Sequence, residues 1–428
     1  MENCNKSIFR SIATLMSGSV LGQLIALAAY PVVTRLFSPS DFGLFNVFYS
    51  YVEVFIILAT GKYELAFPLT ADDAEARALL RYTRRRTALV SSLLLVVVAL
   101  LIVFDALPGK SGALGIVALL IPAVVFFAAN VRLHSFLFNR YQCYYPIAES
   151  AVVYGAATSL LKIGFGLLSR LLPLLSKLGL PLSTVLGQAS ADLSYRLRMR
   201  RLPSSQVATP SREATRAVAR KYRNFPFYVL PKDFINSFSY NLPLIWLALY
   251  FDSAAVGLFA LALTFTFRPI TIVNADVERV LYVRANNHVA AQQPVGGELL
   301  RFFLIVNLVA LPVCVMLFFV AEPLFAWVFG SQWEGCGFYV RCLLPWCYLS
   351  FNAMMFCFVP NIFSTQRTEF FFYVALLMLR VGAMVAGIVF GDFQLAVLLY
   401  ALAGAVVSAA LLLWYAWQLR RYDRGIGA

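Results

Sequence analysis

The chain has 428 residues, of which 61% are hydrophobic and 13% are charged, and its mean hydropathy is +0.76. A water-soluble domain of this composition would expose large apolar surfaces, so the lipid bilayer is its expected solvent. The formal net charge of +14 suits either nucleic acid or an anionic membrane surface. Because the basic residues flank hydrophobic stretches, we expect contact with membrane lipids and no nucleic acid partner.

Twelve hydrophobic stretches follow one another, each close to the roughly 20 residues that a membrane-spanning helix needs. The spans of a β-barrel would alternate in polarity, whereas residues 93–103 and 395–413 are apolar throughout. The expected helices are residues 8–35, 42–69, 87–104, 114–138, 146–169, 178–198, 226–250, 256–283, 299–321, 338–359, 370–390 and 393–418. The sixth is the weakest, because Pro181, Gln188 and Asp192 interrupt it. The predicted fold class is an all-α integral membrane protein with about twelve transmembrane helices.

The second half of the chain echoes the first at a spacing of 214 residues, half of 428. Gly43-Leu44-Phe45 is matched by Gly257-Leu258-Phe259, and Glu64 is matched by Glu278. Duplicated helical bundles are how many carriers build two gates around one central site. The echo predicts two pseudo-symmetric six-helix bundles and favours a transporter.

The basic residues gather on one side of this twelve-span arrangement, in the links after the second and sixth spans and near both chain ends. The positive-inside rule then places both termini in the cytoplasm. We expect an N-terminal bundle over residues 1–198, a cytoplasmic basic linker over 199–225, a C-terminal bundle over 226–420 and a cytoplasmic tail over 421–428. In the link between the second and third spans, Asp72 and Asp73 precede Arg84 to Arg86, an order that predicts a short interfacial helix.

Motifs of enzymes are absent from the sequence. It has two histidines, His134 and His288, and no HExxH, Walker or GxSxG pattern. His134 lies near a span end, where a residue of the membrane interface is expected rather than a ligand. We therefore expect no enzymatic activity, no cofactor and no metal, and transport energy from ion gradients, the membrane potential or substrate turnover.

Charged residues inside membrane spans are costly and usually face a cavity or a partner. Cations predominate near the middle of the expected helices, and arginine and lysine suit phosphate as charged hydrogen-bond donors. The predicted substrate-binding residues are Lys62, Arg132, Lys162, Arg268 and Arg380. The predicted coupling or gate residues are Glu64, Asp276, Glu278 and Arg279. Internal pairing remains an alternative, since Asp276 and Arg279 are three apart on one helix.

Several motifs, in order along both halves, resemble those of bacterial Wzx-type polysaccharide flippases, a branch of the multidrug/oligosaccharidyl-lipid/polysaccharide exporter superfamily. They are PVVTRLFSPSDFG at 31–43, YELA at 63–66, DD at 72–73, YRNFP at 222–226, NS at 236–237, NLP at 241–243, GLF at 257–259, FG at 329–330, Trp333, Gly335, Tyr339 and PW at 345–346. The family often has a glutamine near the position of Arg279, so the polarity of the inner gate departs from its pattern here.

The resemblance implies alternating access and the movement of undecaprenyl-diphosphate-linked oligosaccharide repeat units to the outer leaflet of the bacterial inner membrane. It also implies a role in O-antigen, capsule or exopolysaccharide synthesis, beside a polysaccharide polymerase and a chain-length regulator. Lys62, Arg268 and Arg380 are the cations that the resemblance assigns to the diphosphate. Two alternatives stay open, a multidrug or cation antiporter of the same superfamily and a membrane polysaccharide polymerase.

Overall fold

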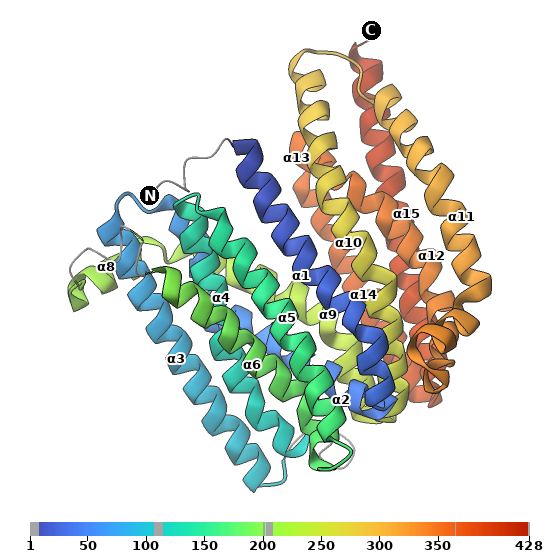
Figure 1. Ribbon diagram of the computed structural model, residues 1–428. Coiled ribbons are helices and arrows are strands. Elements are labelled where there is room, and N and C mark those ends of the chain that lie inside the picture. The colour runs from blue at the N-terminus through green and yellow to red at the C-terminus, as the bar shows by residue number, and fades with distance from the viewer. Residues whose placement is uncertain (1–7, 107–113, 200–201, 203–208, 364, 427–428) are drawn as a thin grey trace. The chain divides into compact units, whose positions relative to one another are not determined.

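The computed structural model describes residues 8–106, 114–199, 202, 209–363 and 365–426 (Figure 1). Within these residues the chain is helical and has no strand, and twelve of its helices have 20 or more residues. They are α1 (Ile8–Leu36), α2 (Pro39–Thr60), α3 (Asp73–Val103), α4 (Ile121–Arg140), α5 (Tyr144–Leu168), α6 (Leu174–Met199), α9 (Leu230–Tyr250), α10 (Ser253–Ala290), α11 (Gly296–Phe329), α12 (Cys336–Met355), α14 (Gln366–Phe390) and α15 (Phe393–Ile426).

Short helical segments join the long helices. They are η1 (Tyr63–Leu69), η3 (Gly115–Leu120), α8 (Arg212–Lys221), the π-helical turn η4 (Phe225–Val229), η5 (Ser331–Trp333) and α13 (Val359–Ile362). Nine of the described helices are long and apolar enough to cross a membrane. The other three long helices are α1, α6 and α9, and α6 contains the polar residues that weakened the sixth expected span. The predicted all-α integral membrane fold is confirmed, and the chain is a multi-pass membrane protein.

The second expected span is shorter than the sequence suggests. Helix α2 begins with a capping box, in which Ser38 and Asp41 each satisfy a backbone N–H of the other, and Pro39 occupies the first helical position. It ends at Thr60, where Gly61 and Lys62 both adopt left-handed backbone conformations, with φ of 62° and 61°. The expectation of one helix over 42–69 is therefore wrong, and Lys62 and Glu64 lie beyond the break.

The link after this break also differs from expectation. The predicted interfacial helix is not separate, because α3 runs without interruption from Asp73 to Val103. Asp72 caps its first turn by accepting a hydrogen bond from the Glu75 N–H at 2.7 Å. The acids therefore mark the start of the third span itself.

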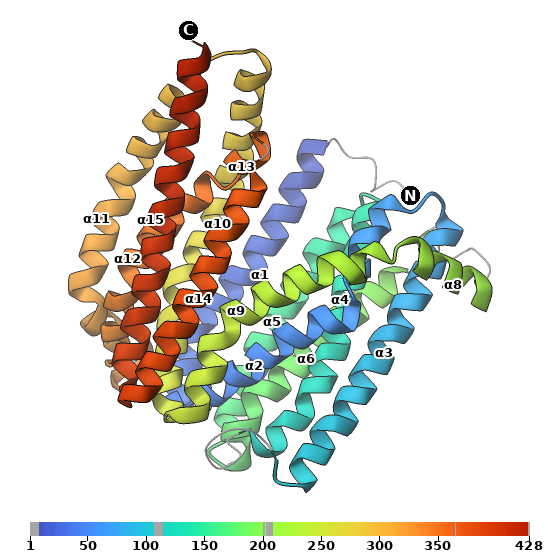
Figure 2. The same cartoon turned by 180° about the vertical axis from the view of Figure 1, so that it is seen from behind.

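The chain forms two compact units, residues 1–254 and 255–428. In the first unit, α1 packs closely against α5 because small residues meet there: a Cβ added at Gly155 would lie 2.4 Å from the carbonyl oxygen of Gly22. Figure 2 shows α9 running beside α2, and these two helices are in contact. The contacts thus group α9 with the first unit, whereas the expected bundle boundary at 199–225, which we retain as a prediction, would place it in the second.

One end of the first unit is closed by an apolar core that includes the connector after α6. Side chains of η1, α3, α4 and α6 pack there with Leu202, Val218 and Tyr222. The Tyr63 hydroxyl donates to the carbonyl of Ala219 at 3.2 Å, and the Tyr222 hydroxyl donates to that of Leu69 at 3.0 Å. The short helix α8 is therefore docked on the bundle, as Figure 1 shows beside α3.

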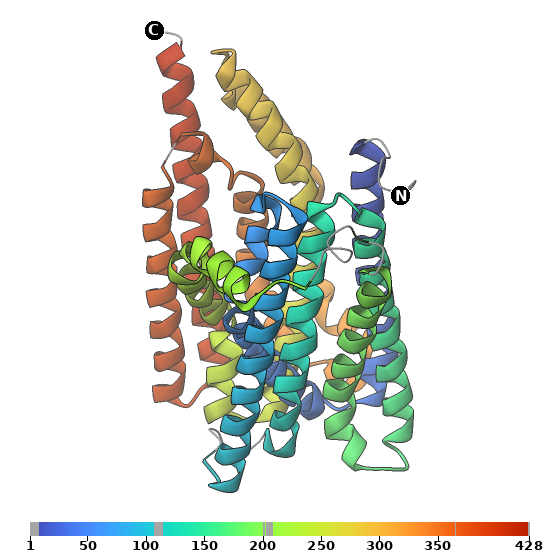
Figure 3. The same cartoon turned by 90° about the vertical axis from the view of Figure 1, so that its left-hand side faces the viewer.

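The second unit is built around α12, α14 and α15, and Figure 3 shows α14 and α15 side by side. Aromatic rings fill its interior: Phe259 contacts the edges of Tyr339, Phe393 and Tyr400 with ring centroids 6.3 Å apart in each pair. Edge-to-face packing of this kind stabilises a helical core without polar groups. It also gives π surfaces on which a cation can rest.

Candidate functional site

The break after α2 brings a buried lysine against an aspartate of α9. The ammonium of Lys62 lies 2.6 Å from a carboxylate oxygen of Asp233, and the two side chains are 9% and 32% exposed. A left-handed conformation costs a non-glycine residue roughly 1–2 kcal/mol, so the surrounding contacts must hold Lys62 in place. Near this pair, the Asn241 amide of α9 donates to Glu53 of α2 at 3.1 Å. Two polar contacts therefore tie α9 to α2 and its break.

Glu64 lies two residues further on, in η1, and is buried almost completely. Its side chain is 1% exposed, and neither carboxylate oxygen accepts a hydrogen bond from the described residues. The Nε of Arg132, on α4, is 3.7 Å away, within ion-pair distance but beyond that of a hydrogen bond. Burying a carboxylate with so little compensation is costly, so Glu64 stands out among the acids of this unit.

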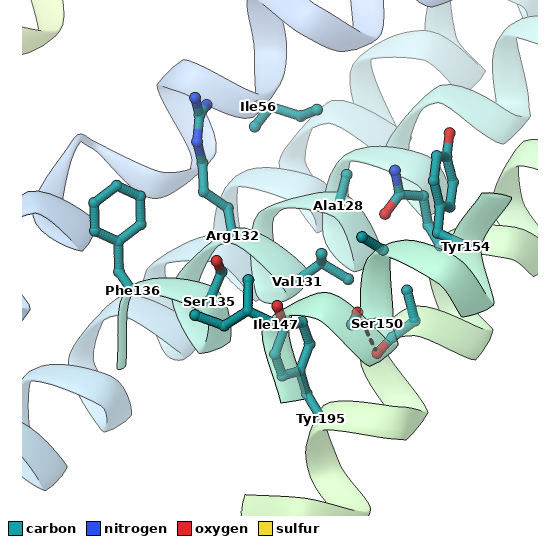
Figure 4. Close-up of a pocket in the computed structure, with 13 residues that line it drawn as sticks. Ile56, Ala128, Val131, Arg132, Ser135, Phe136, Ile147, Ser150, Tyr154 and Tyr195 are labelled. Carbon is teal, nitrogen blue, oxygen red and sulfur yellow. Dashed lines mark hydrogen bonds between the residues drawn. The ribbon is translucent and has the colours of Figure 1, made fainter. Parts of the chain in front are cut away.

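Arg132 itself lines a cavity of about 400 Å³ within the first unit. Its side chain is 42% exposed, and Figure 4 shows the guanidinium extending away from Ser150 and Tyr195. The cavity is lined by residues of α2, α4, α5 and α6, and its polar members are Arg132, Ser135, Ser150, Tyr154, Gln188 and Tyr195. Arginine and hydroxyl donors on an otherwise apolar wall suit an anionic oxygen group.

Lys162 is placed differently from the other predicted cations of this unit. Its ammonium sits over the ring of Phe45 at 4.8 Å and over that of Tyr30 at 5.7 Å. The residues that line the cavity do not include Lys162 or Lys62. Among the three predicted cations of residues 1–254, the structure thus brings Arg132 to the cavity and Lys62 to an acid.

Arg380, in the second unit, is a buried cation held between two aromatic rings. Its residue is 6% exposed, and the guanidinium carbon lies 5.0 Å from the Trp346 ring centroid and 4.8 Å from that of Tyr400. The ion pairs of the described residues do not include Arg380, and its Nε makes no hydrogen bond. Desolvating a charge without a carboxylate costs several kcal/mol, so an anionic partner would be strongly favoured there.

The remaining predicted residues lie on α10. Arg268 is exposed, and its carbonyl accepts the Thr271 hydroxyl at 2.9 Å. Glu278 is half-buried and is in hydrogen-bond contact with Cys357. The side chains of Asp276 and Arg279 lie outside the described part of the structure, so the predicted pairing between them stays a prediction.

The structure also contains charged groups that the sequence analysis did not assign to a site. His134 was expected at the membrane interface, but it is 0% exposed, and its Nδ1 lies 3.1 Å from a buried carboxylate oxygen of Asp192. Arg196 holds the other oxygen of Asp192 at 2.6 Å. Asp233 is a second omission. The cost of an acid in a membrane helix was the available signal for both aspartates, but spacing alone does not reveal a partner on another helix.

Comparison with known proteins agrees with this description. The model of the family described as "Polysaccharide biosynthesis protein" matches residues 194–337. No curated protein matches the sequence significantly.

Solved structures match nearly the whole chain at low sequence identity. An inward-facing multidrug resistance transporter of the MATE family, in the MOP superfamily, is 15% identical over 98% of this chain and 99% of its own, with a TM-score of 0.71. The lipid II flippase MurJ in an inward closed conformation is 13% identical over 98% and 91%, with a TM-score of 0.67. A MOP superfamily transporter from Pyrococcus furiosus, described as having a binding pocket of reverse polarity, is 15% identical over 96% and 95%, with a TM-score of 0.58.

These structural matches define the fold, and the family model adds a link to polysaccharide biosynthesis. Residues 194–337 thus resemble a polysaccharide biosynthesis family, and the whole chain has the fold of the MATE-family transporter and of the lipid II flippase.

Proposed function

We propose that this chain is a flippase that moves polyprenyl-diphosphate-linked oligosaccharide repeat units from the inner to the outer leaflet of the bacterial cytoplasmic membrane by alternating access. The observation that carries the proposal is the buried guanidinium of Arg380, which has no ion-paired acid among the described residues. Arg132 supports it, because its partly exposed side chain lines a cavity. The family model and the fold shared with a lipid II flippase also support it.

In this proposal the diphosphate provides the negative charge that Arg380 lacks, and it replaces Glu64 as the partner of Arg132. A guanidinium offers paired N–H donors to phosphate oxygens, and a hydrogen bond to a charged group contributes about 1.5–3 kcal/mol. The inside-negative membrane potential favours outward movement of an anion by about 2.3 kcal/mol per net charge and 100 mV. Both termini lie in the cytoplasm, and a polysaccharide polymerase and chain-length regulator act on the product.

Glu64 is the proposed coupling residue. Its oxygens accept no hydrogen bond from the described residues and lie 3.7 Å from Arg132, so an ion bound at Glu64 would compete with Arg132 and free that cation for phosphate. Glu278, Asp276 and Arg279 are proposed gate residues on α10. Lys62, Lys162 and Arg268 remain proposed substrate residues, although Lys62 must first give up its contact with Asp233.

A proteoliposome assay tests the function. A fluorescent polyprenyl-diphosphate disaccharide is placed in both leaflets, and membrane-impermeant dithionite bleaches the outer pool, so that flipping raises the fraction bleached. We expect Arg132→Gln and Arg380→Gln to slow flipping roughly ten- to hundred-fold, as loss of one charged hydrogen bond implies. Arg301→Gln, at an exposed position of α11, is the matched control and should flip at the normal rate. Normal rates in both test variants would contradict the proposal.

The second candidate is a multidrug or cation antiporter, and the buried carboxylate of Glu64 favours it. Such a protein would export organic cations in exchange for protons that enter down their gradient. It would leave the fluorescent diphosphate in its original leaflet. Glu64→Gln would then abolish cation transport. The same liposomes, loaded with ethidium, separate the two functions.

A further inference from the structure

A cavity of the second unit lies between α14 and α15, and Arg380 is not among the residues that line it. It has a volume of about 650 Å³ and is formed by the end of α15, the start of α14 and the segment just before it. Its apolar surface comes from Phe363, Trp414, Trp417 and Tyr422. Its polar groups are Thr365, Thr368, Gln418 and Arg421. The groove thus combines an aromatic wall with a cluster of hydrogen-bond donors.

Arg421 is the cation of this groove, and it has no ion-pair partner among the described residues. Its guanidinium carbon lies over the ring of Trp417 at 5.4 Å, which fixes the charge beside the groove. The acids nearby are already engaged. Asp423 accepts the backbone N–H groups of Val295 and Gly296, both at 2.8 Å. Glu369 accepts the Tyr415 hydroxyl at 3.0 Å.

The position of the groove suits the surface of a bilayer. Trp417 is 54% exposed, and tryptophans of this kind gather where headgroups meet acyl chains. The same end of α15 carries Arg420 and Arg424, both exposed. Basic pockets between membrane helices on the cytoplasmic side bind the headgroups of anionic lipids. The single cation and neighbouring hydroxyls match a phosphodiester, which carries one negative charge, better than a diphosphate.

We propose that this groove is a binding site for an anionic glycerophospholipid, with the phosphodiester at Arg421 and Thr368 and an acyl chain along Trp414 and Trp417. The groove is lined by none of the proposed substrate or gate residues, and the proposal does not depend on which substrate is moved. Lipid bound here would hold the ends of α14 and α15 together at the membrane surface.

Quenching of tryptophan fluorescence by brominated lipids tests the proposal. The full chain is reconstituted in phosphatidylethanolamine vesicles with increasing fractions of brominated phosphatidylglycerol or brominated phosphatidylcholine. A Trp414→Phe/Trp417→Phe variant gives the quenching of the other tryptophans, which is subtracted. We expect half-quenching at a roughly five-fold lower fraction of phosphatidylglycerol than of phosphatidylcholine, the preference that one basic residue near the surface supplies.

Adjacent arginines supply the matched controls. Arg421→Gln should abolish the preference, whereas Arg420→Gln removes the same charge outside the lining of the groove and should preserve it. Equal loss in the two variants, or no preference in the unmodified chain, would show that only general surface charge attracts the lipid and would overturn the site. Displacement of phosphatidylglycerol by a ten-fold lower fraction of undecaprenyl phosphate would also overturn it, because the groove would then belong to polyprenyl lipids.

Discussion

Removing either partner of the Lys62–Asp233 contact should destabilise the first unit more than removal of an exposed pair. At 2.6 Å and an effective dielectric constant of about 20, two unit charges attract by about 6 kcal/mol. The Asp233 side chain is 32% exposed, so solvent screening reduces this value, and we expect a coupling energy of about 2 kcal/mol. Each single variant leaves one charge without its partner, which should cost about 2–4 kcal/mol.

A double-mutant cycle measures the coupling directly. The free energy of unfolding is determined in mixed micelles of dodecyl maltoside and sodium dodecyl sulfate for Lys62→Met, Asp233→Asn and the double variant. The Arg341–Glu322 pair is the control, because its atoms are 3.1 Å apart but its side chains are 34% and 39% exposed. That pair should couple by less than about 1 kcal/mol. A Lys62–Asp233 coupling no larger than that of the control would refute the reasoning.

Three further changes have definite expected results. Gly155→Val should push α1 away from α5 and lower the free energy of unfolding by about 1–3 kcal/mol in the same assay. Gly164→Val is the control, because a Cβ there has no neighbour within 4 Å, and it should be near neutral. Equal losses in the two variants would exclude the close contact as the cause. Trp346→Leu should remove one cation–π contact of Arg380 and lower stability by about 2 kcal/mol or more, and an Arg380→Gln background should reduce that loss. The hydrogen bond to Glu75 raises the pKa of Lys221 above 10.5, so this tie of α8 is complete below that pH and is lost as pH rises through the raised value. Subtilisin should then cleave α8 faster at a pH above the raised pKa of Lys221 than at a pH below it. If the Glu75→Gln variant showed the same increase in cleavage rate with pH, the role of the pair would be contradicted.

The helices of this chain could be predicted because their apolar runs have the length that a bilayer requires. The capping pattern of Ser38 and Asp41 also follows from local sequence. The break at Gly61 and Lys62 was missed because the apolar residues 54–59 and 65–69 read as one long span, although a left-handed glycine such as Gly61 commonly ends a helix. The helix ends there because Tyr63, Ala66 and Phe67 of η1 pack into the core at the end of the unit, a position that a continuous α2 would not give them.

The candidate site was predictable as a set of costly charges, but not as a set of partners. Arg132 and Arg380 were two of the five predicted intramembrane cations, and the structure places the first at a cavity and the second between two rings. The contacts of Lys62 with Asp233 and of His134 with Asp192 join segments that are distant in sequence. Periodicity reports which face of one helix is polar, and tertiary packing decides what that face meets.

The docking of α8 changes where the chain can bend. Hydroxyl and ionic contacts hold α8 and Tyr222 against η1 and α3, so this part of the basic connector is bound to the helical bundle. The polypeptide leaves the first unit through the non-helical residues 251–252, where Phe251 is extended with φ of −118° and ψ of 172°. A proline or an inserted glycine at residues 251–252 would therefore change the backbone between α9 and α10 without altering any proposed substrate residue.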